Sequence, residues 1–137
     1  MRYITFIYLF FFALGCAGPP KTASEQHQLN GTWVPVKQEI GGKLLPFGAF
    51  EKQQLIILDS GYTFTAESVD KGIVKYTADK MDIYGKEGVN KGKHFTALYK
   101  LENDHLTICY NLMGDGYPET FETKAKPMYF LSVFKKN

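Results

Sequence analysis

The sequence contains few of the residues that most often form cross-links or read nucleic acids. It has two cysteines and one tryptophan among 137 residues, and Arg2 is its only arginine. A disulfide framework requires more cysteines than this. Nucleic-acid recognition relies on arginine and on a basic stripe, whereas residues 16–137 carry 15 lysines against 14 acidic residues, a net charge of +1. We therefore expect neither a disulfide-rich fold nor a nucleic-acid partner.

The sequence also has no apolar run long enough to span a membrane, which takes about 20 residues. Its N-terminus has a basic start, a mostly apolar stretch at 3–14, and then Gly15 and Cys16, with two prolines soon after. Glycine and proline end the apolar run before it reaches spanning length. This order is typical of a cleavable signal peptide, so we predict that residues 1–15 are removed.

The four residues Ala13, Leu14, Gly15 and Cys16 resemble the lipobox of bacterial lipoproteins. The resemblance implies that Cys16 carries a diacylglyceryl group and that the new amino terminus is acylated, with palmitate as the type of chain. Residues 16–28 are then a lipidated cysteine followed by a polar, flexible spacer. Since Ala17 is not an aspartate, the sorting pattern of such proteins implies a cell-envelope location, at the outer membrane where one exists. A secretory peptide with an incidental cysteine is the alternative.

Residues 29–137 are predicted to form one all-β domain, because aromatic and apolar residues recur there in short alternating runs. The clearest run covers 95–112 around Asn103 and Asp104, which tolerate the positive φ of a two-residue hairpin turn. With that turn, Tyr99 faces Ile108, and one face of the hairpin is entirely apolar or aromatic. A slip by one residue would mix the two faces.

The other predicted elements follow from the same alternation and from turn residues. A second hairpin turns at Ser60 and Gly61 and pairs Ile57 with Phe64. A short helix is expected after the first strand, at 46–53. The remaining strands are expected at 32–40, 72–78, 81–84, 119–123 and 128–134. About eight short antiparallel strands joined by tight turns predict a small closed barrel.

The opening Leu29, Gly31 and Trp33 resembles the first strand of lipocalins, and the domain as a whole resembles small, uncharacterised bacterial lipocalin-like proteins. The resemblance also covers Gly42 and Lys43, Met81 to Ile83, Gly92 and Lys93, the hairpin from Tyr99 to Cys109, Pro118 and Phe121. It implies an eight-stranded barrel in which Trp33 plugs the closed end. Tyr117 departs from the family pattern, where we expect arginine. The resemblance implies a fold and a location, and no reaction.

Catalytic and metal-binding chemistry is not expected from the sequence, and we predict neither an enzyme nor a cofactor. His94 and His105 fall far apart on the outer face of the predicted hairpin, and Cys109 lies in mid-strand without a neighbouring base. Nothing in the sequence brings together the carboxylates of Asp82, Glu119 and Glu122.

Two functional classes remain: a membrane-tethered binder of a small apolar or amphipathic molecule, and a cell-envelope structural or protein-interaction module with a filled barrel. A void of about 300 Å³ or more favours the binder. The loop 85–93 is read either as a flap at the barrel mouth or, by preference, as a solvated hairpin loop. The inward-facing residues that would contact a ligand, or fill the core, are Tyr62, Phe64, Phe95, Ala97, Tyr99 and Tyr110.

Overall fold

The computed structural model describes residues 28–137, which fold into a closed antiparallel β-barrel with almost no helix. The predicted signal peptide, Cys16 and all of the spacer except Gln28 lie outside the described residues. The elements are β1 (Gly31–Ile40), β2 (Lys43–Leu44), the 3₁₀ helix η1 (Phe47–Ala49), β3 (Gln54–Leu58), β4 (Gly61–Thr65), β5 (Val69–Thr77), β6 (Lys80–Glu87), β7 (His94–Glu102), β8 (His105–Asn111) and β9 (Tyr129–Lys136). Among these residues there is no helix long and apolar enough to cross a membrane.

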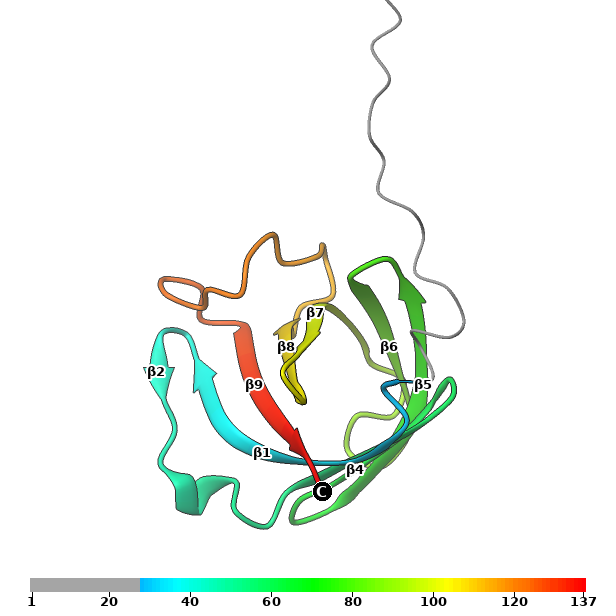
Figure 1. The fold of residues 1–137 in the computed structure, drawn as a ribbon. Coiled ribbons are helices and arrows are strands. Elements are labelled where there is room, and N and C mark those ends of the chain that lie inside the picture. The colour runs from blue at the N-terminus through cyan, green and yellow to red at the C-terminus, as the bar shows by residue number, and fades with distance from the viewer. Residues whose placement is uncertain (1–27) are drawn as a thin grey trace, which may run out of the picture.

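Eight of the nine strands form the barrel, and β2 is an additional short strand on β1. β1 pairs with β3, each later strand pairs with the next, and β9 returns to β1, as Figure 1 shows with red β9 between cyan β1 and yellow β8. The predicted all-β, lipocalin-like barrel is therefore confirmed. The expected helix at 46–53 is reduced to the single turn of η1, since Gly48 lies inside it and lowers the helix propensity there.

The hairpin of β7 and β8 has the predicted register. Tyr99 pairs with Ile108 and Leu101 with Leu106, and the turn residues Asn103 and Asp104 have φ of 49° and 59°. Such left-handed turn residues match the twist of the flanking strands. The alternation thus directs one face of each strand into the barrel core.

The hairpin of β3 and β4 differs from the prediction by two residues. Its turn lies at Asp59 and Ser60, with φ of 53° at Asp59, so that Ile57 pairs with Tyr62 and not with Phe64. The prediction was wrong because glycine at position 61 marked the turn one residue late. A slip of two residues keeps the same side chains on the inner face, so the inward direction of Ile57 and Phe64 is unaffected.

The strand expected at 119–123 is absent, and this prediction was wrong. Residues 112–128, orange in Figure 1, instead form an irregular connection along the outer face of the barrel. Pro118 has no N–H for a ladder, and it lies buried beside the outward-facing Leu98 of β7. The outward-facing Cys109 and Leu131 are also buried, so a small second core lies outside the barrel wall.

The two ends of the barrel are built differently. At what we call the closed end, Trp33 is 1% exposed, its Nε1–H donates to the Leu29 carbonyl at 2.8 Å, and the Lys136 ammonium lies 5.3 Å from its ring centroid. The tight turns at 59–60, 78–79 and 103–104 lie at this end. The longer connections 41–53, 88–93 and 112–128 lie at the opposite, open end.

Candidate functional site

The barrel encloses a cavity of about 440 Å³ on the open-end side of its core. Its walls are mainly aliphatic and aromatic, with a few polar residues near the mouth. The residues that line it are Leu55, Ile57, Tyr62, Phe64, Asp70, Val74, Tyr76, Met81, Ile83, Asn90, Lys93, Phe95, Ile108, Tyr110, Leu112, Met128 and Phe130. A cavity of this size and lining is typical of small-molecule sites, which are concave and mostly apolar.

The structure divides the inward residues that the sequence singled out into two groups. The side chains that line the cavity are Tyr62, Phe64, Phe95 and Tyr110. Ala97 and Tyr99 do not line it, although both are buried. The Tyr99 hydroxyl donates to the Ala78 carbonyl at 3.1 Å, so this side chain points to the closed-end turn.

Sequence reasoning missed several lining residues, of which Tyr76 and Asp70 matter most. Tyr76 shares the inward face of β5 with Val74, and the period of two would have identified it. Asp70 escaped notice because β5 begins at Val69, earlier than the predicted strand at 72–78. Asn90 and Lys93 belong to a loop that had been read mainly as solvated.

Tyr76 has the one buried side-chain polar atom among the described residues that lacks a hydrogen-bond partner, its hydroxyl oxygen. Its ring packs edge-on against Tyr99, with centroids 5.8 Å apart. Burial, and then the neighbouring Tyr99, raises the pKa of Tyr76 to about 12. The hydroxyl therefore stays protonated at neutral pH and remains a hydrogen-bond donor.

Two further tyrosines share this environment. Burial raises the pKa of Tyr110 above its ordinary value, and Tyr62 and Tyr76 add to the shift. Burial, followed by the charge of Asp70, raises the pKa of Tyr62. The interior is thus lined by neutral phenols that donate hydrogen bonds and do not ionise at physiological pH.

The loop between β6 and β7 is fastened at the mouth of the cavity. Asp70 is 4% exposed, and its Oδ1 accepts the backbone N–H of Asn90 at 2.9 Å. Gly88 has φ of 86° and packs so closely on Asp70 that a Cβ at this position would overlap its carboxylate. Val89 at the loop tip is 67% exposed, whereas Asn90 and Lys93 line the cavity. The loop therefore has both an anchored part and a solvent-facing tip.

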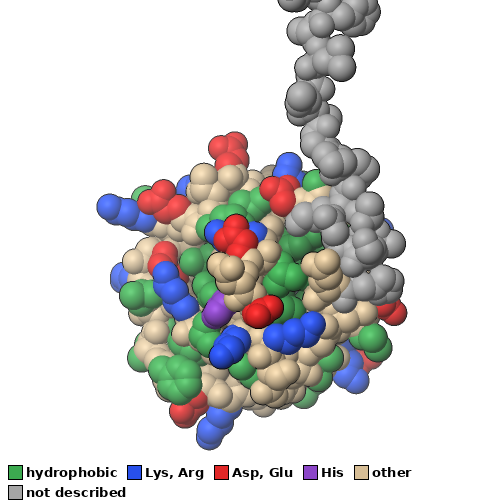
Figure 2. Space-filling view, in the orientation of Figure 1, with side chains coloured by type: hydrophobic (Ala, Val, Ile, Leu, Met, Phe, Trp, Pro, Cys, Tyr) green, Lys and Arg blue, Asp and Glu red, His purple; other side chains and the backbone are tan. Residues whose placement is uncertain are grey.

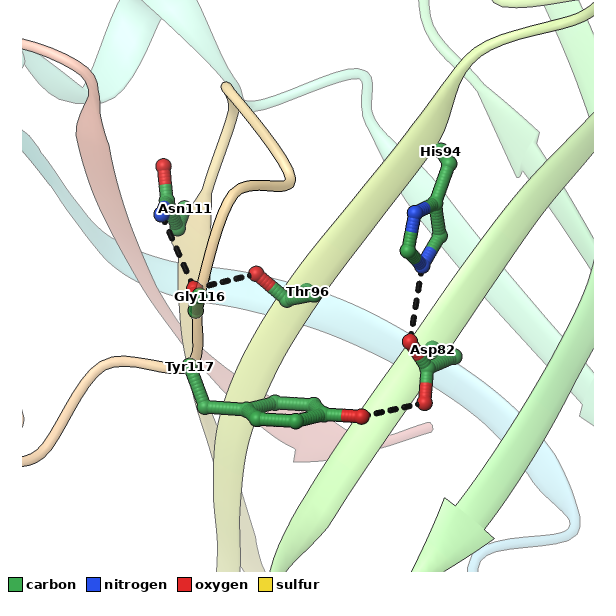
Figure 3. A network of polar contacts seen from close by, with 6 residues as sticks. All are labelled: Asp82, His94, Thr96, Asn111, Gly116 and Tyr117. Atoms are coloured by element: carbon green, nitrogen blue, oxygen red, sulfur yellow. Dashed lines mark hydrogen bonds and ion pairs between the residues drawn. The ribbon is translucent and has the colours of Figure 1, made fainter.

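A polar cluster on the outer wall joins three residues that the sequence had not brought together (Figure 3). Asp82 accepts hydrogen bonds from His94 Nε2 at 2.7 Å and from the Tyr117 hydroxyl at 2.5 Å. Burial alone would raise the pKa of Asp82, but these hydrogen bonds and the nearby His94 and Lys75 hold it below its ordinary value. The hydrogen bond to Asp82 raises the pKa of Tyr117, with smaller contributions from burial.

The outer cluster fastens the connection 112–128 to the barrel wall. Beside Tyr117, the Gly116 carbonyl accepts hydrogen bonds from Thr96 Oγ1 at 2.6 Å and from Asn111 Nδ2 at 2.9 Å (Figure 3). His94 faces outward as predicted, where its ring stacks on Tyr84 with centroids 4.6 Å apart. The contacts are those of a structural clamp.

The remaining candidates for chemistry lie apart from one another. His105 bonds to the Asn103 carbonyl at the closed end, and burial raises the pKa of the Cys109 thiol to about 11, which disfavours the thiolate. Among residues 28–137, no three His, Cys, Asp or Glu side chains converge as metal ligands would. On the face shown in Figure 2, lysine and acidic side chains are interspersed and do not form a patch of one sign.

The fold and cavity together define a small lipocalin-like barrel with a void in its interior. Comparison with known proteins adds no relative: no family model matches the chain, and no curated protein or solved structure matches it either.

Proposed function

We propose that this domain binds a small apolar or amphipathic molecule inside the barrel. The observation that carries the proposal is the cavity of about 440 Å³ with predominantly apolar walls. At about 30 Å³ for a water-sized group in a liquid, that volume has room for roughly 15 non-hydrogen atoms. A ligand of this size is a single alkyl chain or a compact ring system.

The energetics of such a complex are favourable. Burying about 12 methylene groups contributes roughly 10 kcal/mol at about 0.8 kcal/mol each. Association costs of at least about 4 kcal/mol leave about 6 kcal/mol, which corresponds to a dissociation constant of tens of micromolar. The alternative function, a structural or interaction module, requires a filled barrel. The void disfavours that alternative.

The test uses the neutral fluorescent probe N-phenyl-1-naphthylamine, whose emission rises in apolar surroundings. The protein is the chain from residue 17 onward, which contains every strand. Val74 and Ile73 are adjacent in β5, but Val74 is 5% exposed and lines the cavity while Ile73 faces outward and is 40% exposed. We expect Val74→Phe to weaken probe binding at least tenfold and Ile73→Phe to leave it unchanged.

Equal probe binding by both variants would overturn the proposal. Should Val74→Phe reduce the folded fraction, which circular dichroism would reveal, Leu112→Phe fills the cavity from a half-buried position nearer the mouth.

We further propose that the domain is held at a membrane of the cell envelope by lipid on Cys16. The support is the signal-peptide pattern and the lipobox resemblance of the sequence. Several acyl chains bind far more firmly than the single chain that gives only marginal attachment. Cys16→Ser should abolish labelling by a palmitate analogue and release the protein from the membrane fraction. Cys109→Ser, a change at a fully buried thiol, is the matched control and should retain both the label and the location.

A further inference from the structure

The polar groups that line the cavity lie at two different depths. Asp70, Asn90 and Lys93 lie at the mouth, where Lys93 Nζ approaches Asn90 Oδ1 at 3.4 Å. Tyr76 follows Asp70 by six residues on β5, which at about 3.3 Å per residue places it roughly 20 Å further along the strand, in the direction of the closed end. A bound molecule therefore meets charged groups near the solvent and neutral phenols deep in the barrel.

The Tyr76 hydroxyl is the deep group that lacks a partner. Buried hydroxyls almost always form a hydrogen bond, and an unsatisfied one destabilises the folded protein. Because the hydroxyl is protonated and donates, the natural partner is an acceptor oxygen brought in by the ligand. The neighbouring lining residues Tyr62 and Tyr110 are also hydrogen-bond donors.

The residues that line the cavity also limit which charge a ligand can carry. Lys93 is the only lysine, arginine or histidine among the residues that line the cavity, and it lies at the mouth. A carboxylate placed beside Tyr76 would lose its hydration without gaining a cation. A carboxylate placed beside Lys93 would leave the Tyr76 hydroxyl without an acceptor and would approach Asp70.

We propose that the ligand is a neutral amphiphile of roughly 15 non-hydrogen atoms whose alcohol, carbonyl or ether oxygen accepts a hydrogen bond from the Tyr76 hydroxyl deep in the cavity. The Tyr76 ring lines the cavity while its hydroxyl oxygen is covered, so binding includes a small shift of this side chain that opens the hydroxyl to the ligand. This inference rests on the proposed function and specifies its ligand class. The chain enters with its oxygen leading, and its apolar tail extends toward Phe95, Phe130 and Met128. Ionised fatty acids of the same length are poor ligands.

The test is displacement of N-phenyl-1-naphthylamine at pH 8 by 1-dodecanol and by dodecanoate, two chains of matched length. It compares the wild type with Tyr76→Phe, and uses Tyr84→Phe on the outer face as the matched control. We expect dodecanol to displace the probe at a concentration at least fivefold lower than dodecanoate. Tyr76→Phe should weaken dodecanol five- to tenfold relative to the probe, whereas Tyr84→Phe should have no effect.

Three results would overturn the inference. The first is unchanged dodecanol binding in Tyr76→Phe, and the second is dodecanoate binding as tightly as dodecanol. The third is dodecanoate binding that is lost in Lys93→Met, which would place the head group at the mouth. Failure of the proposed function gives a different result, because the probe itself would then bind without regard to Val74→Phe.

Discussion

The same strands form both ends of the barrel, but the two ends differ in the length of their connections and in how completely their side chains are buried. At the closed end, two-residue turns use left-handed residues such as Asp59, Ala78 and Asn103, and the indole of Trp33 is covered on all sides. At the open end, three of the four connections are long, the exception being residues 66–68, and apolar side chains such as Val89 and Met113 are more than 60% exposed. Figure 2 also shows hydrophobic side chains at the surface over β2 and η1, which adjoin the open end.

We infer from this difference that the closed end mainly stabilises the fold and that the open end mainly binds the ligand. Side chains fill the space at the closed end and are fully packed there. We therefore expect the free energy of unfolding to depend mainly on that end. The open end leaves a void and a loop with one anchored side, and such low-stability regions supply most binding sites. The predictions below test the separation, beginning with the largest effect.

Removing the buried indole should produce the largest loss of stability. Trp33→Ala deletes a side chain that is 1% exposed, and we expect the free energy of unfolding to fall by about 4 kcal/mol. Phe47→Ala, at the open-end helix η1, removes a ring that is 61% exposed and should change it by less than about 0.5 kcal/mol. Urea titration followed by circular dichroism measures both, since Trp33 is the only tryptophan. Equal losses of unfolding free energy in the two variants would contradict the difference in stability between the two ends.

Two glycines of the β6–β7 loop test how firmly the mouth is anchored. Gly88 and Gly92 have φ of 86° and 81°, so alanine at either costs about 1 kcal/mol of backbone strain. A Cβ at Gly92 meets nothing within 4 Å, whereas one at Gly88 would overlap Asp70. We therefore expect Gly88→Ala to lower the free energy of unfolding by about 2 kcal/mol or more, and to speed amide exchange at Asn90. Similar losses in the two variants would show that the loop is not anchored on Asp70.

The clamp on the outer wall should depend on pH. The pKa of Asp82 is depressed in the folded state, so its stabilisation is present above the unfolded pKa near 4 and is lost as the pH falls through the lower, folded value. Asp82→Asn should therefore reduce the free energy of unfolding at pH 7 by about 1–2 kcal/mol, with the difference from wild type shrinking below pH 4. Glu102→Gln, an exposed closed-end carboxylate, is the control. A difference that persists at pH 2 would contradict the clamp.

Two tyrosines in mutual contact should respond in opposite directions. Tyr76→Phe removes a buried hydroxyl that has no partner, and we expect the unliganded protein to become about 1 kcal/mol more stable. Tyr99→Phe removes the hydrogen bond to the Ala78 carbonyl and should destabilise by about 1 kcal/mol. Thermal unfolding of the two variants distinguishes them. A loss of stability in Tyr76→Phe would mean that its hydroxyl is satisfied in the unliganded barrel.

The closed end was the more predictable from sequence, because its structure is local. Asn103 and Asp104 specify a turn, and alternation around them specifies which side chains enter the core. The same alternation cannot detect a slip of two residues, and for this reason the turn at Asp59 was placed wrongly. Local sequence rules therefore predict the face of the sheet on which a side chain lies more reliably than they predict the residue with which it pairs on the neighbouring strand.

The open end and the outer wall were less predictable, because their contacts join distant segments. Tyr117 and Asp82 are 35 residues apart, and no spacing rule relates them. Asp70 and Asn90 meet only because a loop after β6 returns to the start of β5. The sequence predicted that the aromatic residues of the cavity point inward. Whether a void remains depends on their summed volume compared with the volume inside the barrel, and no short segment of sequence determines that difference.

The pairing of β1 with β9 makes the first and last strands of the described domain each other's neighbours. The ring closes through pairs such as Trp33 with Lys136, whose residues are about as far apart in sequence as the domain allows. Closure is therefore a step of high contact order, which slows folding. A growing chain that lacks its last strand exposes the edges of both β1 and β8, and such edges are templates for intermolecular pairing. We accordingly expect aggregation during synthesis to be greatest just before the eight residues of β9 become available.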